Sequence, residues 1–195
     1  MNQEIEEQAG ANDELKEEFK VLMLASLRPY KGVNEFLKLA EEMPQIGFDL
    51  ILSDSKEDVD FWKLKSNIPE NLTILSVQNN VIPWYKSASV VINLTHKDEC
   101  LETFGMTILE GMKFGLPSIV PTAGGVTELV LDGQNGFQID YYDLDEIKRV
   151  VEEMQTNFQF WQGLSQHALE HSRKFSRENF NEKMSQLLRF QVAPE

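Results

Sequence analysis

Short, mainly apolar runs alternate along this chain with segments in which apolar residues recur every three or four positions. The apolar runs lie at 21–24, 48–52, 72–75, 90–94 and 117–120. The segments with helical spacing lie at 33–43, 84–88, 106–114, 126–131, 143–156 and 158–190. Strand followed by helix, repeated, is typical of a parallel sheet with helices on both faces. The pattern therefore predicts an α/β fold built as a three-layer sandwich.

The two ends of the chain differ from this alternating part. Residues 1–20 carry seven acidic side chains against Lys16 and Lys20, which predicts a solvated lead-in or linker. Asp143 and Ser176 precede helical segments near the other end and are the expected N-caps. We expect one folded domain over 21–190.

The charge balance excludes several kinds of partner. The 18 Lys and Arg residues against 32 Asp and Glu give a formal net charge of −14, which repels phosphate backbones and anionic lipid surfaces. We therefore expect no nucleic-acid partner and no strong membrane association. The single cysteine, Cys100, cannot form an internal disulfide, and no apolar run approaches the roughly 18 residues of a membrane span. These features predict a soluble, cytoplasmic domain.

Candidate chemistry gathers in four loops that leave the expected strands at their carboxyl ends. Ligands of open parallel sheets bind beyond those ends. The loops cover 26–32, 77–82, 95–105 and 121–125. They are the places where the sequence predicts a binding site.

The third loop carries the strongest signal, because Gly105 stands where it becomes a helix. Free backbone N–H groups and the positive end of the helix dipole make such a position an anion site suited to a diphosphate. Glu102 and Glu110 flank it without lying on it, and a carboxylate is a good acceptor for a vicinal diol. The arrangement suits a nucleotide sugar, although an ordinary amphipathic helix with two solvated glutamates gives the same spacing.

Cations and glycines in two other loops extend this picture. Arg28 can fork onto two phosphate oxygens and Lys31 can act as a point charge, or both can simply be solvated surface residues. The pair Gly124-Gly125 permits either close backbone approach to a ligand or a tight turn.

With these residues in place, the chain resembles the nucleotide-binding, C-terminal half of family 4 retaining glycosyltransferases, the group 1 family of GT-B fold. The resemblance runs from about residue 21 to 190 and centres on the pair Glu102 and Glu110 in the context E-x-F-G-x-x-x-x-E. Four further matches follow in order and spacing, and they are Lys31-Gly32, Gly115-Leu116-Pro117, Gly124-Gly125 with Glu128-Leu129-Val130, and Asp132-Gly133 to Asn135-Gly136-Phe137. The resemblance implies a Rossmann-like domain that forms one half of a GT-B architecture.

The resemblance also implies roles for individual residues. Glu110 would hold the ribose hydroxyls, Glu102 would contact the transferred sugar, and Lys31 would neutralise the diphosphate leaving group. The implied catalytic residues are Glu102, Lys31 and Arg28. The implied donor-binding residues are Glu110, Phe104, Gly105, Met106, Thr107, Ser26, Val77, Gln78, Val81, Thr95, Gly124 and Gly125, with 77–81 cradling the base. A nucleoside-diphosphate sugar is the implied substrate, transfer of a hexose with retention is the implied reaction, and no metal or cofactor is expected.

The chain departs from the family pattern in three places. Ser26 stands where the family has its phosphate-binding arginine, and Arg28 comes two residues late, so either Arg28 reaches the diphosphate instead or phosphate neutralisation is weaker. Leu94-Thr95 replaces the family's Pro-Ser, so the Thr95 hydroxyl is the expected substitute. Nothing before Val21 could build the N-terminal acceptor-binding domain of a GT-B enzyme, so we expect donor binding at most, and little or no transfer, from this chain alone.

Several titratable residues have simpler interpretations. His96 could touch the donor sugar, but a lone histidine in a polar loop is more often solvated. His167 and His171 have the i, i+4 spacing of metal ligands on a helix, yet no acidic motif accompanies them, which favours a surface role. Cys100 has no basic residue placed to activate it.

Two groups of aromatic residues favour packing over ligand binding. The pair Trp84-Tyr85 is expected in the core rather than stacked on a base. Phe158, Phe160 and Trp161 form a cluster that either packs the last helices or covers a further domain.

Other functions remain as alternatives. A non-catalytic nucleotide-binding or interaction module would keep the fold without donor chemistry, and the serine at position 26 and the expected absence of an N-terminal half favour it. A nucleotide-sugar epimerase would need a different arrangement of carboxylates and histidine. A dinucleotide-dependent dehydrogenase is disfavoured because no G-x-G-x-x-G follows the first expected strand.

Overall fold

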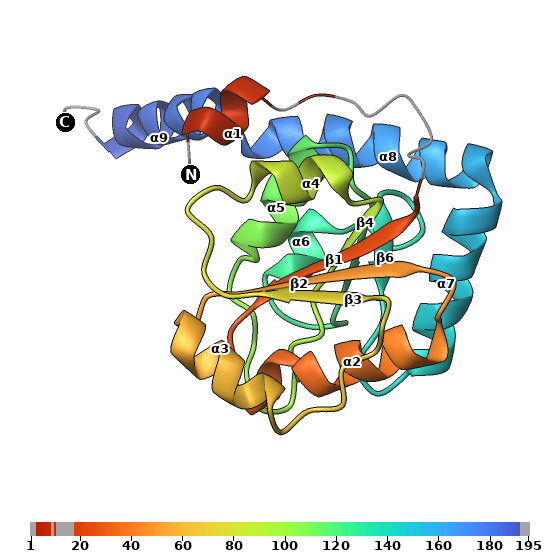
Figure 1. The fold of residues 1–195 in the computed structure, drawn as a ribbon. Coiled ribbons are helices and arrows are strands. Elements are labelled where there is room, and N and C mark those ends of the chain that lie inside the picture. The colour runs from red at the N-terminus through yellow and green to blue at the C-terminus, as the bar shows by residue number, and fades with distance from the viewer. Residues whose placement is uncertain (1–2, 9, 11–17, 192–195) are drawn as a thin grey trace.

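The computed structural model describes residues 3–8, 10 and 18–191. Its centre is a six-stranded sheet in the order β3-β2-β1-β4-β5-β6, and every neighbouring pair is parallel (Figure 1). The strands are β1 (Lys20–Ala25), β2 (Gly47–Leu52), β3 (Leu72–Leu75), β4 (Val90–Ile92), β5 (Ser118–Val120) and β6 (Gly136–Gln138). The expected α/β, Rossmann-like fold is therefore confirmed.

Helices cover both faces of this sheet (Figure 1). The α-helices are α1 (Gln3–Gln8), α2 (Val33–Glu42), α3 (Lys56–Lys63), α4 (Ile82–Ser87), α5 (Met106–Lys113), α6 (Val126–Leu129), α7 (Leu144–Thr156), α8 (Phe158–Ser172) and α9 (Arg177–Gln191). Two 3-10 turns, η1 (Pro29–Lys31) and η2 (Arg173–Phe175), join them. No helix in the described part of the chain has the length and apolarity needed to cross a membrane.

Alternating strand residues build two hydrophobic cores. In β1, Val21 and Met23 pack into the core under α2, α3 and α7, whereas Leu22 packs into the core under α4, α5 and α6. This follows from the two-residue period of a strand, which sends successive side chains to opposite faces. α8 closes both cores, with Trp161 in the first and Ala168 in the second.

The strand order creates the place for a ligand. The chain winds from β1 outward to β3, and then returns to the other side of β1 to add β4, β5 and β6. The order therefore reverses between β1 and β4, and the loops leaving these two strands diverge to opposite faces. In such sheets the crevice beyond the carboxyl ends at this reversal is the binding position.

Three features of the helices differ from the sequence-based prediction. α3 was not expected, because Val59 is its one buried residue and its apolar spacing is weak. The segment expected as a solvated lead-in contains α1, whose Ile5 is 1% exposed; residues 1–2, 9 and 11–17 of it lie outside the described part. The long helix expected at 158–190 is interrupted by η2.

Both expected N-caps are confirmed. The amide of Glu146 donates to Asp143 Oδ1 at 3.4 Å, and the amide of Asn179 donates to Ser176 Oγ at 3.2 Å. Capping by Ser176 explains why η2 ends there and α9 begins, since the serine oxygen satisfies an amide in the first turn.

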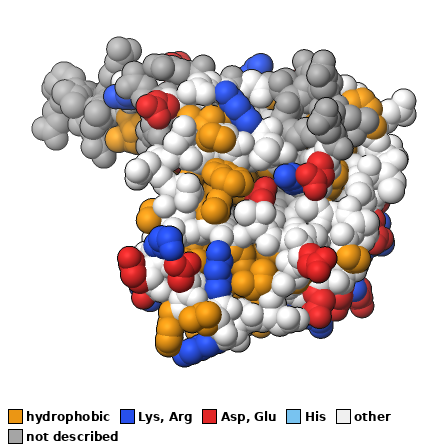
Figure 2. Space-filling model, viewed as in Figure 1, with side chains coloured by type: hydrophobic (Ala, Val, Ile, Leu, Met, Phe, Trp, Pro, Cys, Tyr) orange, Lys and Arg blue, Asp and Glu red, His pale blue; other side chains and the backbone are white. Residues whose placement is uncertain are grey.

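The surface carries charges of both signs in spite of the acidic composition. On the face drawn in Figure 2, Lys and Arg side chains are interspersed with Asp and Glu and with exposed hydrophobic residues. A continuous basic stripe, which nucleic-acid-binding domains present, does not form on this face of the described residues.

Candidate functional site: a cavity at the carboxyl edge of the sheet

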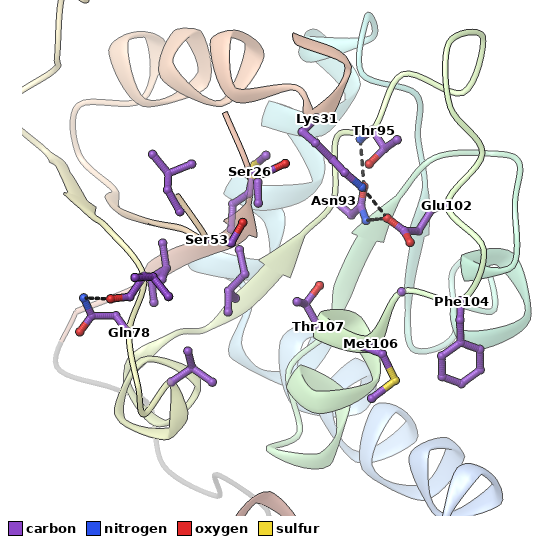
Figure 3. Close-up of a pocket in the computed structure, with 18 of the residues that line it drawn as sticks. Ser26, Lys31, Ser53, Gln78, Asn93, Thr95, Glu102, Phe104, Met106 and Thr107 are labelled. Carbon is purple, nitrogen blue, oxygen red and sulfur yellow. Dashed lines mark hydrogen bonds and ion pairs between the residues drawn. The ribbon is translucent and has the colours of Figure 1, made fainter. Parts of the chain in front are cut away.

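A cavity of about 440 Å³ opens at the predicted position, beyond the carboxyl ends of β1, β2 and β4 and against the start of α5 (Figure 3). Nineteen residues line it: Met23, Leu24, Ala25, Ser26, Lys31, Ile51, Leu52, Ser53, Val77, Gln78, Val81, Asn93, Thr95, Glu102, Thr103, Phe104, Gly105, Met106 and Thr107. Loops far apart in the sequence thus meet at one site.

The start of α5 presents unpaired backbone donors to this cavity. Gly105 is the N-cap with φ +77°, a conformation that glycine adopts without a steric penalty, and no side chain caps the helix. The amides of Gly105, Met106 and Thr107 donate no hydrogen bond within the described residues, while the Gly105 carbonyl already accepts from Ile108 at 3.0 Å. Unpaired amides at the positive end of a helix dipole form an anion site.

A lysine and a glutamate lie together on the adjoining wall. Lys31 Nζ is 2.9 Å from Glu102 Oε2, and Asn93 Nδ2 lies 3.5 Å from the same oxygen (Figure 3). The two charged side chains are 24% and 20% exposed, so water screens the pair only in part. The structure therefore brings two of the three expected catalytic residues into contact.

The third, Arg28, does not reach the cavity. Its side chain is exposed and it is absent from the lining, whereas Ser26 lines the cavity. Arg28 is the residue before η1, and Pro29 begins that turn, so the chain bends away from β1 at this point. The sequence left open whether Arg28 reaches the diphosphate or its neutralisation is weaker, and this geometry favours the second, because Lys31 is the one Lys or Arg residue in the described lining.

The two glycines at 124 and 125 contact protein backbone rather than the cavity. A Cβ at Gly124 would lie 2.6 Å from the Glu102 carbonyl oxygen, and one at Gly125 would lie 1.9 Å from the Thr103 carbonyl oxygen. The Gly125 amide also donates to the Glu102 carbonyl at 2.7 Å. They are absent from the lining, so the predicted close approach is to the loop that carries Glu102 and not to the ligand space.

Glu110 lies below the lining rather than in it. Its Oε2 accepts a hydrogen bond from the Tyr85 hydroxyl at 3.0 Å. Burial raises the pKa of the Glu110 carboxyl, and the Tyr85 hydrogen bond and the charge of Lys113 act in the opposite direction. The expected core position of Tyr85 is confirmed, since it is 0% exposed, stacked on Phe114 with ring centroids 5.6 Å apart.

Thr95 is a buried polar residue with an unused side chain. It is 1% exposed and lines the cavity, and its Oγ1 has no hydrogen-bond partner among the residues described. Its main-chain amide donates to Asn93 Oδ1 at 2.9 Å, which fixes the backbone there. Buried hydroxyl groups almost always have a partner, so this oxygen is available to a ligand or to a water molecule beside the cavity.

The side of the cavity expected to hold a base is mainly apolar. Val77, Gln78 and Val81 line it, as predicted, together with Leu24 and Ile51. The amide of Val77 donates to the Asp54 carbonyl at 3.1 Å, and the Gln78 amide group donates to the Ser76 carbonyl at 2.9 Å. The Gln78 amide group also lies 3.4 Å from the Val77 carbonyl, the contact drawn in Figure 3. These bonds fix the turn after β3.

Asn93 and Ser53 line the cavity but were not expected from the sequence. Asn93 falls within the run 90–94 that the sequence predicts as a strand, although β4 ends at Ile92, and Ser53 directly follows β2. The rule that ligands bind at the carboxyl ends of parallel strands would have found both, since each is the first polar residue beyond a strand.

The three histidines make local contacts outside the cavity lining. His96 does not line the cavity, and its ring stacks on Tyr141 with centroids 3.7 Å apart while Nδ1 lies 3.0 Å from Glu99 Oε1. His167 and His171 contact the main-chain carbonyls of Gln134 and Glu128, each at 3.1 Å. Within the described residues, no group of three or more His, Cys, Asp or Glu could hold a metal ion.

The aromatic cluster on α8 packs onto the domain. Phe158 stacks near Trp161 with centroids 6.0 Å apart, and Trp161 is 4% exposed with Nε1 donating to the Ser89 carbonyl at 2.8 Å. Phe160 lies 6.1 Å from Phe137. These contacts explain the cluster as packing for the last helices.

The fold and the cavity define a class of protein: a parallel, Rossmann-like domain with a candidate anion site where the strand order reverses. Over residues 4–170 the chain matches the family described as Glycosyl transferases group 1, and it belongs to that family. The GT-B resemblance stated from the sequence is thereby confirmed.

Comparison with individual proteins shows similarity along most of the chain. It is 30% identical over 69% of its length to an uncharacterized glycosyltransferase of Methanocaldococcus jannaschii, covering 42% of that protein. It is 24% identical over 85% of its length to the poly(glycerol-phosphate) alpha-glucosyltransferase of Bacillus subtilis, covering 25% of it. Among solved structures, Anabaena Alr3699/HepE in complex with UDP and glucose matches 88% of this chain with a TM-score of 0.76 and 21% identity, over 48% of that chain. The chain thus spans less than half the length of each.

Proposed function

We propose that this chain forms the donor-binding part of a retaining glycosyltransferase, which binds a nucleoside-diphosphate sugar and transfers its hexose to an acceptor. The observation that carries the proposal is the meeting of the unpaired amides at the start of α5 with Lys31 and Glu102 around one cavity. Family membership makes glycosyl transfer the expected chemistry, and HepE, of similar fold, is a protein solved with UDP and with UDP-glucose.

Each part of such a donor has a matching wall. The diphosphate fits the amides of Gly105, Met106 and Thr107, and the base fits the apolar wall near Val77. The sugar hydroxyls fit Glu102, because a carboxylate accepts hydrogen bonds from diols. The Thr95 hydroxyl, which lacks a partner in the described structure, supplies one more contact to the donor.

The proposed reaction breaks the bond between the anomeric carbon and the diphosphate oxygen, and forms a bond from that carbon to an acceptor hydroxyl oxygen on the same face. The proton of that hydroxyl passes to the departing diphosphate. Negative charge builds on the departing diphosphate, so fixed amides and Lys31 stabilise the transition state more than the ground state. We assign no protein nucleophile, and the proposed mechanism uses no metal ion.

Acceptor binding is proposed to belong to a part of the protein outside this chain. The curated relatives are at least twice as long as the stretch that matches, and a GT-B enzyme closes two domains around its donor. We therefore propose that this chain alone binds donor with little or no transfer activity.

A second function is favoured by the charge of the cavity. Lys31 is the one basic residue in the described lining, and it is already paired with Glu102, while Arg28 lies outside. A diphosphate therefore meets a lining whose side-chain charges cancel. A binding or interaction module that has lost donor chemistry fits this balance.

Calorimetric titration of the chain with UDP, GDP, ADP and UDP-glucose distinguishes the two functions. The variant is Lys31→Met, and the matched control is Lys97→Met, because Lys97 is 25% exposed and pairs with Asp140 at 2.6 Å outside the cavity lining. The glycosyltransferase proposal expects the wild type to bind one of the nucleoside diphosphates. The affinity for it should fall about tenfold or more in Lys31→Met and stay unchanged in the control. Equal affinities in all three proteins, or no binding of any nucleotide by the wild type, would favour the module.

A further inference from the structure

A buried tyrosine lies against the glutamate proposed to bind ribose. Tyr85 on α4 is 0% exposed, and its hydroxyl is 3.0 Å from Glu110 Oε2 and 3.2 Å from the Thr107 carbonyl oxygen. Both partners belong to α5, so this hydroxyl joins the two helices at one point.

This contact lies one helical turn beneath the cavity wall. On α5, Thr107 lines the cavity and Glu110 follows three residues later on the same face. On the other side, Val81 precedes α4 and lines the cavity, and Tyr85 follows four residues later. Side chains of a helix lean toward its N-terminus, so the Glu110 carboxylate leans toward the turn that faces the cavity. The carboxylate is therefore within reach of a ligand seated against Thr107.

Only part of the hydrogen-bonding capacity of the Glu110 carboxylate is used. The Tyr85 hydroxyl has a single proton to donate, and the two oxygens beside it, Glu110 Oε2 and the Thr107 carbonyl oxygen, can only accept. Oε2 of Glu110 accepts from Tyr85, while Oε1 makes no hydrogen bond to the residues that the structure describes. A half-buried carboxylate oxygen without a partner suits a donor from a ligand, such as a ribose hydroxyl.

The charge state of Glu110 depends on the same contact. Burial raises the pKa of Glu110, and the Tyr85 hydroxyl offsets part of that rise by donating to the carboxylate. Without this hydroxyl the carboxyl would hold its proton to higher pH, and a protonated carboxyl is a poorer acceptor for two hydroxyls.

We propose that Tyr85 is a positioning residue for ribose recognition, which fixes Glu110 through Oε2 and leaves Oε1 to accept from the ribose hydroxyls of the donor. The inference rests on the proposed donor site and extends it to α4, which does not touch the ligand through this side chain. It predicts that the preference for a ribonucleotide over one lacking both ribose hydroxyls depends on Tyr85.

The test compares UDP with 2′,3′-dideoxy-UDP by calorimetric titration of wild type and Tyr85→Phe. We expect the wild type to prefer UDP, and the preference to fall about tenfold in Tyr85→Phe while the affinity for the dideoxy compound stays unchanged. The matched control is Tyr142→Phe, because the Tyr142 hydroxyl also bonds a carboxylate, Asp140 Oδ2 at 3.0 Å, away from the cavity lining. That variant should keep the wild-type preference.

A third pair of proteins tests whether Tyr85 acts through Glu110. In a Glu110→Gln background, Tyr85→Phe should change the preference no further, since the residue it positions has already been altered. An independent effect of Tyr85→Phe in that background, a wild-type preference in Tyr85→Phe alone, or an equal loss for both compounds would each overturn the positioning role.

Failure of the wider proposal gives a different result. If the wild type binds neither compound, the donor site itself is refuted and this inference falls with it. If the wild type binds both compounds equally well, the donor site stands and the ribose role of Glu110 is refuted, together with that of Tyr85.

Discussion

Replacement of Gly125 by alanine should disturb the proposed donor site without touching the ligand. The backbone at Gly125 has φ −64°, which alanine adopts readily, so any effect comes from the added methyl group. That Cβ would lie 1.9 Å from the Thr103 carbonyl oxygen, whereas real contacts of this kind are not shorter than 3.0 Å, so the two segments must separate by at least about 1.1 Å. The hydrogen bond from the Gly125 amide to Glu102, now 2.7 Å, would break.

The expected consequences are a loss of stability and a loss of affinity. Overpacking of this kind costs about 1–3 kcal/mol of unfolding free energy, and a displacement of about 1 Å at a binding constellation weakens it by up to about 100-fold. Urea denaturation measures the first, and calorimetric titration with UDP measures the second. The affinity should fall because Glu102 and the unpaired amides at Gly105 are on the displaced segment.

A glycine elsewhere supplies the control. Gly163 lies within α8 with nothing within 4 Å of an added Cβ, so Gly163→Ala should stabilise the protein by about 0.5–1 kcal/mol and leave UDP binding unchanged. Wild-type stability together with wild-type affinity in Gly125→Ala would refute the view that this glycine supports the loop carrying Glu102.

Three further predictions concern single side chains. Thr95→Val should weaken UDP binding about tenfold, without loss of stability in urea, because the buried Oγ1 lacks a described partner; equal UDP affinity in the two proteins would contradict this. Burial raises the folded-state pKa of Glu110, so its contribution to stability is present at low pH and is lost as pH rises through that pKa. Glu110→Gln should therefore gain stability relative to wild type as pH rises above the ordinary glutamate pKa of about 4.3, and parallel pH profiles of urea midpoints would contradict this. Asn71→Ala should lower the unfolding free energy by about 2 kcal/mol, because Asn71 Nδ2 lies 2.8–3.1 Å from three main-chain carbonyls; an unchanged thermal midpoint would refute that role.

The sheet and the position of the site could be predicted from the sequence because both depend on local patterns. Apolar runs such as 21–24 become buried strands, and the glycine at 105 begins a helix whose first amides have no partner within the described residues. The approach of β1 and β4 then follows from the strand order of such folds.

Side-chain destinations could not be predicted, because they depend on packing between distant segments. Whether Arg28 or Ser26 faces the cavity is decided by the bend at Pro29. The contact of Glu110 with Tyr85 joins residues 25 positions apart, and nothing in the spacing of α5 reveals it. The spacing of the sequence also does not reveal that Gly125 packs against the Thr103 carbonyl oxygen.

The most direct test of the proposed donor site is a ¹⁵N–¹H correlation spectrum of the chain titrated with UDP. The account predicts that the largest shift changes fall on the amides of Gly105, Met106 and Thr107, which have no partner in the described structure and face the cavity. Changes around Val77 and Lys31 should accompany them at the same nucleotide concentrations. Absence of shifts at these positions, or shifts confined to another face of the domain, would contradict the central claim.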